Sequence, residues 1–395
     1  MESPNIFSFN ESSSVEQNEQ NKQTIIVYGS TDIGGGNENQ DKYLILELNG
    51  HSIRILIILD GHGQNGEFVA EIAKRFLEKY FSENLLLLLE NSSECLNIAY
   101  ALTNDEIRNA LKEKSIKENK NVQEVDGYLT SGYNSYSNSL ISGGTTCTIA
   151  VIIDNIHMYV SNVGDSDAIL FTTSNISSKV ISDVNDAINF QNEIVSNIHT
   201  ITGDHSPLNK EEFIRATKNC KDSLIFRYDK LHSKNYSNIY EKNVDDDDYY
   251  ITDKVNYVKN VRKEPATVVS SPEGSPFESS LSMTRSLGDF YLQKYGVSFI
   301  PTIKYVNLSD IFEKSPIFSL LIASDGVWDN WSYETISKFI LNEDYLNRIN
   351  NDEDISKEVC KLLIEENDKL GRKHFGPSCD NATLIVVYCL KPEEK

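Results

Sequence analysis

IRILIILDGHG, residues 53–63, joins a mostly apolar run to a charged turn that contains two glycines. Ile53–Leu59 has the length and the β-branched content of a buried strand. Asp60 stands where this strand ends, so its side chain can face a cleft while the run behind it stays in the core. The stretch therefore predicts a carboxylate at the edge of a sheet.

Three further aspartates stand at the edges of apolar runs: Asp325 after Phe318–Ser324, Asp380 before Ala382–Cys389, and Asp165 between Met158–Val163 and Ala168–Phe171. In antiparallel neighbours the end of one strand lies beside the start of the next, so Asp60, Asp325 and Asp380 can meet along one rim. Carboxylates that share a cleft repel each other unless cations lie between them. Mg²⁺ and Mn²⁺ prefer such oxygen ligands, whereas Zn²⁺ sites usually recruit His or Cys. The pattern predicts a metal site built from hard oxygen ligands.

His62 and Gly61 add chemistry to this rim. Glycine beside Asp60 lets the backbone approach an ion closely. Two ions about 3.5–4 Å apart could hold a phosphoryl group and activate a bridging water, and His62 could protonate the leaving oxygen. The residue types therefore favour metal-assisted phosphoryl hydrolysis.

The charge and cysteine content of the sequence limit the partners and the cellular compartment that we expect. The 395 residues include 59 acidic and 37 basic side chains, a net charge of −22. This field argues against nucleic acid or an anionic membrane as a routine partner. The six cysteines are scattered without close pairs, which indicates a reducing compartment. Met1–Asn21 is polar, unlike a signal peptide or a membrane span. We expect a cytoplasmic and/or nuclear monomer.

The order of the patterns predicts antiparallel sheets covered by helices, an α+β fold, rather than a βαβ winding. Residues 1–23 are expected to be disordered, 24–391 to form one domain, and 392–395 to be a tail. Inserted loops are expected at about 115–141 and 221–278, the second with an acidic run at 245–248. Strand-like runs and helical spacings fill the rest: strands at 24–28, 43–48, 53–59, 145–153, 158–163, 168–171, 318–323 and 382–389, and helices from 67 and over 94–114, 281–295, 333–341 and 355–367.

Seven short motifs occur in an order that resembles the signature of the type-2C, metal-dependent Ser/Thr protein phosphatases, the PPM family: Asp60–Gly63, Ser142–Thr146, Asn162–Ser166, Asp204–Pro207, Thr284–Asp289, Ala323–Asp329 and Asp380–Thr383. The resemblance spans residues 24–390. It implies a four-layer α-β-β-α sandwich, two antiparallel sheets flanked by helices, with the metal cleft at one end. It also implies an enzyme that hydrolyses phosphoserine and phosphothreonine on phosphoprotein substrates.

The resemblance assigns roles to individual residues. It implies two Mg²⁺ or Mn²⁺ ions bridged by Asp60, with the Gly61 carbonyl as a further ligand. Asp325 and Asp380 would complete the shell of one ion, and Asp41 would lie at the other. Asp165 and Asp329 match positions associated with a third, weaker ion, and His62 matches the proposed general acid. Asp289, Arg285 and Thr145–Thr146 are interpreted as structural.

Four features depart from the family pattern. Gln40 precedes Asp41 where Glu is usual, Gly36 stands where a phosphate-binding Arg is expected, and Asp167 ends a turn that usually ends in Arg. The flap region between Asp204 and Thr284 is also longer than usual. These departures keep a second hypothesis open, a catalytically weak or inactive family member that acts as a binding or scaffold protein.

Overall fold

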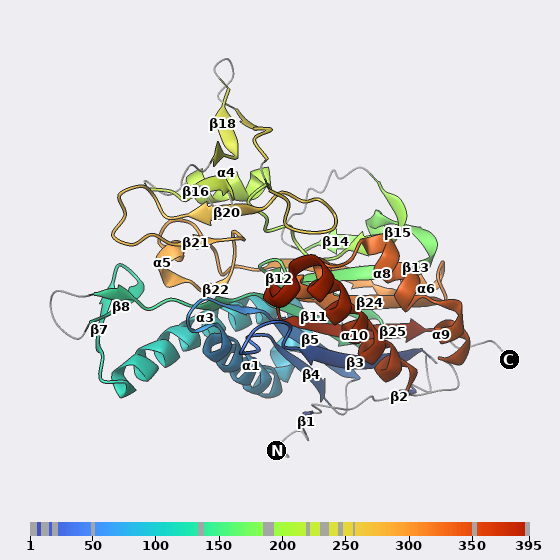
Figure 1. Cartoon of the computed structure of the whole chain (residues 1–395). Coiled ribbons are helices and arrows are strands. Elements are labelled where there is room, and N and C mark those ends of the chain that lie inside the picture. Colours follow the sequence, from blue (N-terminus) through green and yellow to red (C-terminus); the bar gives the residue numbers. More distant parts are fainter. Residues whose placement is uncertain are drawn as a thin grey trace.

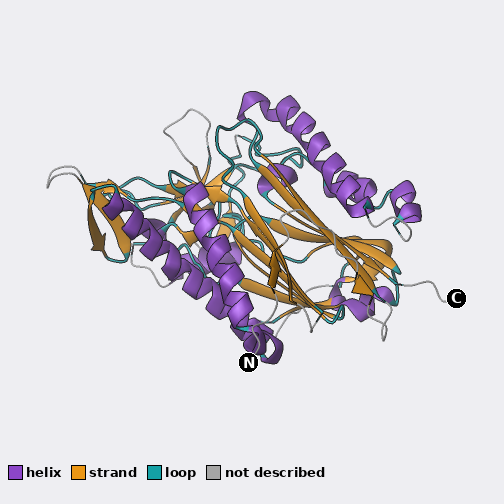
Figure 2. Cartoon of the chain, turned by 90° about the horizontal axis from the view of Figure 1, so that it is seen from below, coloured by secondary structure: helices purple, strands orange, loops and turns teal. Residues whose placement is uncertain are grey.

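The computed structural model describes residues 23–48, 52–132, 138–184, 193–218, 222–229, 237–243, 248–255, 257–349 and 354–391, together with two short strands at 6–8 and 16–17. Most of the segment 1–23, predicted to be disordered, and the tail 392–395 lie outside this described part. Two antiparallel sheets form the middle of the molecule, and long helices lie outside them on both sides (Figure 2).

The first sheet has seven antiparallel strands in the order β1-β4-β5-β11-β12-β23-β14. They are β1 Ile6–Ser8, β4 Lys42–Leu48, β5 Ile53–Leu59, β11 Cys147–Ile153, β12 His157–Val163, β23 Thr302–Asn307 and β14 Ile181–Asp183. β4 and β5 pair in antiparallel orientation, with Leu48 opposite Ile53. The connection between them, residues 49–51, lies outside the described residues.

The second sheet has six antiparallel strands in the order β15-β13-β24-β25-β3-β2. They are β15 Val195–Thr200, β13 Asp167–Ser177, β24 Ile317–Ala323, β25 Ala382–Leu390, β3 Thr24–Asp32 and β2 Glu16–Gln17. The long pairing of β3 with β25 joins the beginning of the domain to its end, with Thr24 opposite Leu390.

Three apolar cores separate four layers. Strand β5 has no alternating polar residues because both of its faces are buried. Ile55 and Ile57 face the core under the helices α1 (Gly66–Glu83) and α3 (Ser92–Lys117), whereas Leu56 faces the core between the sheets. In β25, Leu384 likewise packs toward α10 (Ile355–Phe375) and Ile385 toward the other sheet. The predicted α-β-β-α sandwich is confirmed.

The long helices confirm most of the predicted helical spacings (Figure 1). The helices are α1 Gly66–Glu83, α2 Leu85–Glu90, α3 Ser92–Lys117, α4 Lys210–Lys218, α5 Phe290–Gln293, α6 Leu308–Phe312, α7 Asp325–Trp328, α8 Tyr333–Ile340, α9 Glu343–Arg348 and α10 Ile355–Phe375. Among the described helices, none combines the length and the apolar character needed to cross a bilayer.

The segment 281–295, predicted to be one helix, is not one. It holds the strand residue Leu281, the short strand β22 Leu287–Gly288 and the single turn α5. Gly288 and Asp289 have φ angles of 80° and 45°, in the left-handed region. A right-handed helix cannot continue through two such residues, although the apolar spacing around them is helical.

The two regions predicted as inserted loops form small sheets instead. The first contains β7 Asn121–Val125, β8 Tyr128–Gly132 and β9 Ser139–Leu140. The second contains β16 Ile225–Tyr228, β17 Ser237–Asn238, β18 Tyr240–Lys242, β19 Tyr249–Ile251 and β20 Thr267–Ser270, which continues to β21 Ser280–Leu281. Figure 1 shows the sheet of β16 and β20 together with α4 above the sandwich. Of the acidic run 245–248, only Asp248 is described, and it pairs with Lys210 at 2.8 Å.

Candidate metal and catalytic site

Six aspartates lie at one end of the sandwich because the strands beside them end or begin there. Leu59 pairs with Lys42, so Asp60 and Asp41 follow and precede neighbouring strands. Ala323 pairs with Leu384, which brings the start of α7 to the start of β25. The aspartates so placed are Asp41, Asp60, Asp165, Asp325, Asp329 and Asp380. Asp60 and Asp329 each lie close enough to other aspartates of the group for those charges to act on them.

Asp41 is the most deeply buried carboxylate of this group, and Asp60 beside it is half-buried. Asp41 is 2% exposed, and its Oδ2 accepts a hydrogen bond from Ser324 Oγ at 2.7 Å. Its Oδ1 is buried and has no hydrogen-bond partner among the described residues. Burial raises the pKa of Asp41 to about 7, and the charges of Asp380 and Asp325 add to this effect. Burial, together with the charge of Asp41, also raises the pKa of Asp60 well above its ordinary value.

Lys259 lies among three of the aspartates. Its Nζ is 2.7 Å from Asp325 Oδ2, 3.3 Å from Asp165 Oδ2 and 3.8 Å from Asp329 Oδ2. Burial alone would raise the pKa of Asp325, but Lys259 outweighs it and lowers that pKa below its ordinary value. Asp329 is more weakly paired, and burial raises its pKa to about 7. One ammonium group therefore stabilises the charge of one carboxylate more than that of its neighbours.

The carboxylates fit divalent cations by their chemistry. The buried Oδ1 of Asp41 is a hard oxygen ligand for which the described residues supply no donor. As they stand, no three His, Cys, Asp or Glu side chains of the described residues are grouped closely enough to hold one ion. Mutual repulsion of the carboxylates is a physical reason for this spacing, and bound cations would relieve the repulsion.

His62 faces Asp289, a residue that the sequence had indicated to be structural. His62 Nε2 donates to Asp289 Oδ2 at 2.6 Å, and the same oxygen accepts from Ser286 Oγ at 2.8 Å. Burial alone would lower the pKa of His62, but the charge and hydrogen bond of Asp289 outweigh it and raise the pKa above 6.5. The Asp289 carboxylate thus favours the protonated form of His62, which is the form that can donate a proton.

A short three-stranded sheet sets the distance between His62 and Asp289. Gly144 in β10 (Gly144–Thr145) pairs with His62 in β6 (Gly61–His62) on one side and with Gly288 on the other. A Cβ atom at Gly144 would lie 2.6 Å from His62 Nε2 and would also collide with the Asp289 carboxylate. The glycine in the Ser142–Thr146 motif therefore leaves the room that the His62–Asp289 pair occupies.

Gly36 stands where the family pattern has a phosphate-binding Arg, and as a glycine it has no side chain to bind a phosphate. The loop around Gly36 packs against the start of β25, where the Gly35 N–H donates to the Cys379 carbonyl at 2.9 Å. Arg372 of α10 brings a guanidinium to this loop and donates to the Gly34 carbonyl at 3.4 Å. Gln40 is turned toward the Gly63 carbonyl, at 3.3 Å.

A polar cleft adjoins the Asp165, Asp325 and Asp329 side of the site. Its volume is about 970 Å³, and Asp167, Lys304 and Arg285 also line it. Asp167, which replaces an arginine of the family pattern, accepts a hydrogen bond from Thr202 Oγ1, and burial raises its pKa to about 7. Asp167 therefore lies half-buried in the wall of the cleft, with its carboxylate hydrogen-bonded to Thr202.

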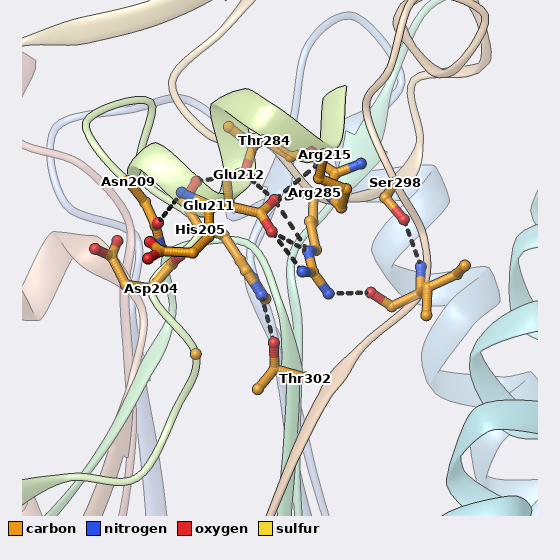
Figure 3. A network of polar contacts seen from close by, with 12 residues as sticks. Asp204, His205, Asn209, Glu211, Glu212, Arg215, Thr284, Arg285, Ser298 and Thr302 are labelled. Atoms are coloured by element: carbon orange, nitrogen blue, oxygen red, sulfur yellow. Dashed lines mark hydrogen bonds and ion pairs between the residues drawn. The ribbon is translucent and has the colours of Figure 1, made fainter. Parts of the chain in front are cut away.

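One wall of this cleft is a buried ion-pair network (Figure 3). Glu212 of α4 accepts from Arg285 Nε at 3.0 and 3.1 Å, from Arg215 Nη2 at 2.8 Å and from Thr284 Oγ1 at 2.7 Å. Because Thr284 and Arg285 begin the segment that carries Ser286 and Asp289, the network fastens α4 to the segment that orients His62. The structural interpretation of Arg285 is confirmed by this contact.

Sequence reasoning did not identify Lys259 or the role of Asp289. Asp289 belongs to one of the seven ordered motifs. A catalytic histidine usually needs an anionic partner, so Asp289 could have been proposed as the partner of His62 from the sequence. Lys259 lies in the long flap region, where no periodic pattern predicts which side chain reaches the rim.

Comparisons with known proteins agree with this architecture. The family model described as Protein phosphatase 2C matches residues 52–223 and 253–369. A relative in Xenopus laevis, Protein phosphatase 1K, mitochondrial, is 24% identical over 359 residues, which cover 91% of this chain and 66% of that protein. Probable protein phosphatase 2C 35 of Arabidopsis thaliana is 24% identical over 364 residues, 90% of this chain and 79% of that protein. This chain thus spans about two thirds or more of the length of these relatives.

A solved structure supports the fold. The serine-threonine phosphatase 2C of Toxoplasma gondii aligns with a TM-score of 0.57 at 15% sequence identity, covering 98% of this chain and 99% of that one. The motifs, the four-layer sandwich and the match to the family model lead to one conclusion: the chain belongs to the protein phosphatase 2C family.

Proposed function

We propose that this chain is a protein serine/threonine phosphatase that hydrolyses phosphoserine and phosphothreonine with two Mg²⁺ or Mn²⁺ ions. The observation that carries the proposal is the convergence of six carboxylates at one end of the sandwich, including the buried and unpartnered Oδ1 of Asp41. Asp41, Asp60, Asp325, Asp380 and the carbonyl of Gly61 would hold the ions. When bound, the ions would polarise the phosphoryl group and supply an activated water as the nucleophile.

The chain's own residues supply the remaining chemistry. His62 holds a proton that it can give to the leaving seryl or threonyl oxygen. Asp289 orients the ring and stabilises its protonated form, as the 2.6 Å contact indicates. The strand ends hold these carboxylates in place before substrate arrives, so little reorganisation accompanies binding.

The net charge and the state of the cysteines bear on the partners of the enzyme and on its cellular compartment. A net charge of −22 favours phosphoproteins with basic surfaces over nucleic acid or anionic membranes. The five cysteines within the described residues are free and buried, which supports a reducing compartment. We therefore propose a monomer in the cytoplasm and/or nucleus. Imaging of a fluorescent fusion tests the location, and a purely mitochondrial signal would contradict it.

Metal dependence on a phosphopeptide tests the proposed activity. The purified chain, stripped with chelator, is assayed for phosphate release from a phosphothreonine peptide with Mn²⁺, with Mg²⁺ and with excess chelator. We expect release with either ion and none with chelator, and full recovery when the ion is restored. Release that persists in chelator, or no release with either ion, would refute the proposal.

A further inference from the structure

We propose that the ammonium group of Lys259 takes the place of a third metal ion at Asp165 and Asp329, so that this chain holds two ions and not three. The inference rests on the proposed function for the two-ion core. It replaces the third ion implied by the sequence resemblance with a cation that belongs to the chain.

The position of the ammonium group is the first reason. Nζ of Lys259 lies 3.3 Å from Asp165 and 3.8 Å from Asp329, the two carboxylates expected at a third ion. It also lies 2.7 Å from Asp325 Oδ2, which leaves the other oxygen of Asp325, Oδ1, as the one that would serve the expected two-ion core. A cation between Asp165 and Asp329 would be a close neighbour of Nζ, and two cations so close repel each other. These two carboxylates therefore do not fit a third ion while Lys259 is in place.

The second reason is that the lysine is held on a structured hairpin, residues 257–266. Val258 and Pro265 form an antiparallel bridge, and the Lys259 N–H donates to the Glu264 carbonyl at 2.7 Å. The Ala266 N–H donates to the Tyr257 carbonyl at 3.0 Å. The backbone of Lys259 is therefore fixed by the hairpin. Less conformational freedom is lost when its ammonium group pairs with the aspartates than would be lost from a flexible loop.

This hairpin is fastened to the segment that carries the carboxylates. The Val261 N–H donates to the Asp329 carbonyl at 3.2 Å, and Asn260 Nδ2 donates to Asp329 Oδ1 at 3.2 Å. Arg262 donates to the Trp331 carbonyl at 3.2 Å, and its guanidinium lies 5.0 Å from the centre of the Tyr333 ring. The lysine and the carboxylates thus sit on one connected unit.

Lys259 is a positioning residue in this account. Its Nζ, 2.7 Å from Asp325 Oδ2, supplies a fixed positive charge beside the two-ion core. A tethered ammonium does not depend on the metal concentration around the protein. The site would therefore need only two ions from solution, and its activation by metal should lack the weak third binding step.

Ion counting in solution tests the inference without an activity readout. The stripped protein is titrated with Mn²⁺ by calorimetry, and bound Mn²⁺ is counted independently by electron paramagnetic resonance. We expect two ions in the natural chain, three in Lys259→Met with the third binding at least tenfold more weakly, and two in Lys259→Arg, which keeps the charge. Lys304→Met is the matched control, because Lys304 lines the same cleft but donates to the Thr202 carbonyl at 2.8 Å, and we expect two ions there.

A double variant tests whether the third ion in Lys259→Met binds at Asp329 and not elsewhere on the protein. Lys259→Met combined with Asp329→Asn should return to two ions, and circular dichroism should show a native fold for each variant. Three ions in the natural chain, or two ions in Lys259→Met with its fold intact, would overturn the inference while leaving the two-ion function standing. No ion bound by the natural chain would overturn both.

Discussion

Glu212→Gln tests the buried network on the wall of the cleft. The glutamate is 4% exposed and accepts hydrogen bonds from two guanidinium groups and one hydroxyl. Glutamine removes the charge and presents an amide N–H₂ toward donors, so Arg285, itself 15% exposed, loses its counter-charge. Breaking a buried ion pair from one side costs about 3–5 kcal/mol. The lower end applies here because Arg215 is 31% exposed and can turn toward water.

Urea denaturation followed by fluorescence and circular dichroism measures this loss. With an m-value of about 3 kcal/mol per molar, a loss of about 3 kcal/mol lowers the unfolding midpoint by about 1 M. Glu211→Gln is the matched control, because Glu211 is the exposed neighbour on the same helix, and its midpoint should stay within about 0.2 M of the natural protein. Equal midpoints for both variants would refute the stabilising role of the network.

Because Glu212 is ionisable, the difference between the unfolding midpoints of Glu212→Gln and Glu211→Gln should depend on pH. Burial opposes ionisation of Glu212, but Arg285 and Arg215 outweigh it and hold its pKa well below the ordinary value of 4.5. The stabilisation is therefore present above pH 4.5 and is lost as the pH falls through the lowered pKa of the folded state. The gap between the two midpoints should be constant from about pH 6 to 8 and shrink in acid below about pH 4. A gap that grows in acid would contradict this sign.

Three further changes probe the catalytic end. Asp289→Asn removes the charge that raises the pKa of His62, so the basic limb of the pH–rate profile should move to lower pH; an unmoved limb would show that His62 is not the acid. His62→Ala should slow hydrolysis of an alkyl phosphate by about 100-fold or more, but slow hydrolysis of nitrophenyl phosphate less, because nitrophenolate leaves without a proton; equal losses would argue against a general acid. Gly61→Ala would place a Cβ atom 2.5 Å from the Gly66 carbonyl oxygen, so its unfolding midpoint should fall by the equivalent of about 1–3 kcal/mol, and an unchanged midpoint in the same urea assay would contradict that collision.

Buried strands were the easiest elements to predict. Ile53–Leu59 and Ala382–Leu390 are covered on both faces, so they stand out as nearly continuous apolar runs. The aspartates at their ends followed from the rule that neighbouring antiparallel strands share a rim. The convergence of Asp60, Asp325 and Asp380 was therefore predictable from sequence.

The segments between these strands were less predictable because single residues control them. Leu281–Tyr295 has helical spacing, yet the left-handed backbone at Gly288 and Asp289 breaks it into a strand and one turn. The small sheets within 221–278 are built from strands of two to four residues, too short for a periodic signal. Lys259 reaches the rim only because of that irregular segment, so its ion pairs could not be read from the sequence.

Phosphate release from a phosphothreonine peptide by Asp60→Asn tests the central claim most directly. Asp60 would help to hold the ions, so at saturating Mn²⁺ the variant should lose at least about 100-fold in kcat/KM. Asp310→Asn should keep the natural rate, because this exposed aspartate on α6 lies beyond Asn307, which pairs with the start of β12, whereas Asp165 follows the other end of that strand. Activity of Asp60→Asn within threefold of the natural protein, with a native circular dichroism spectrum and no contaminating phosphatase, would contradict the account.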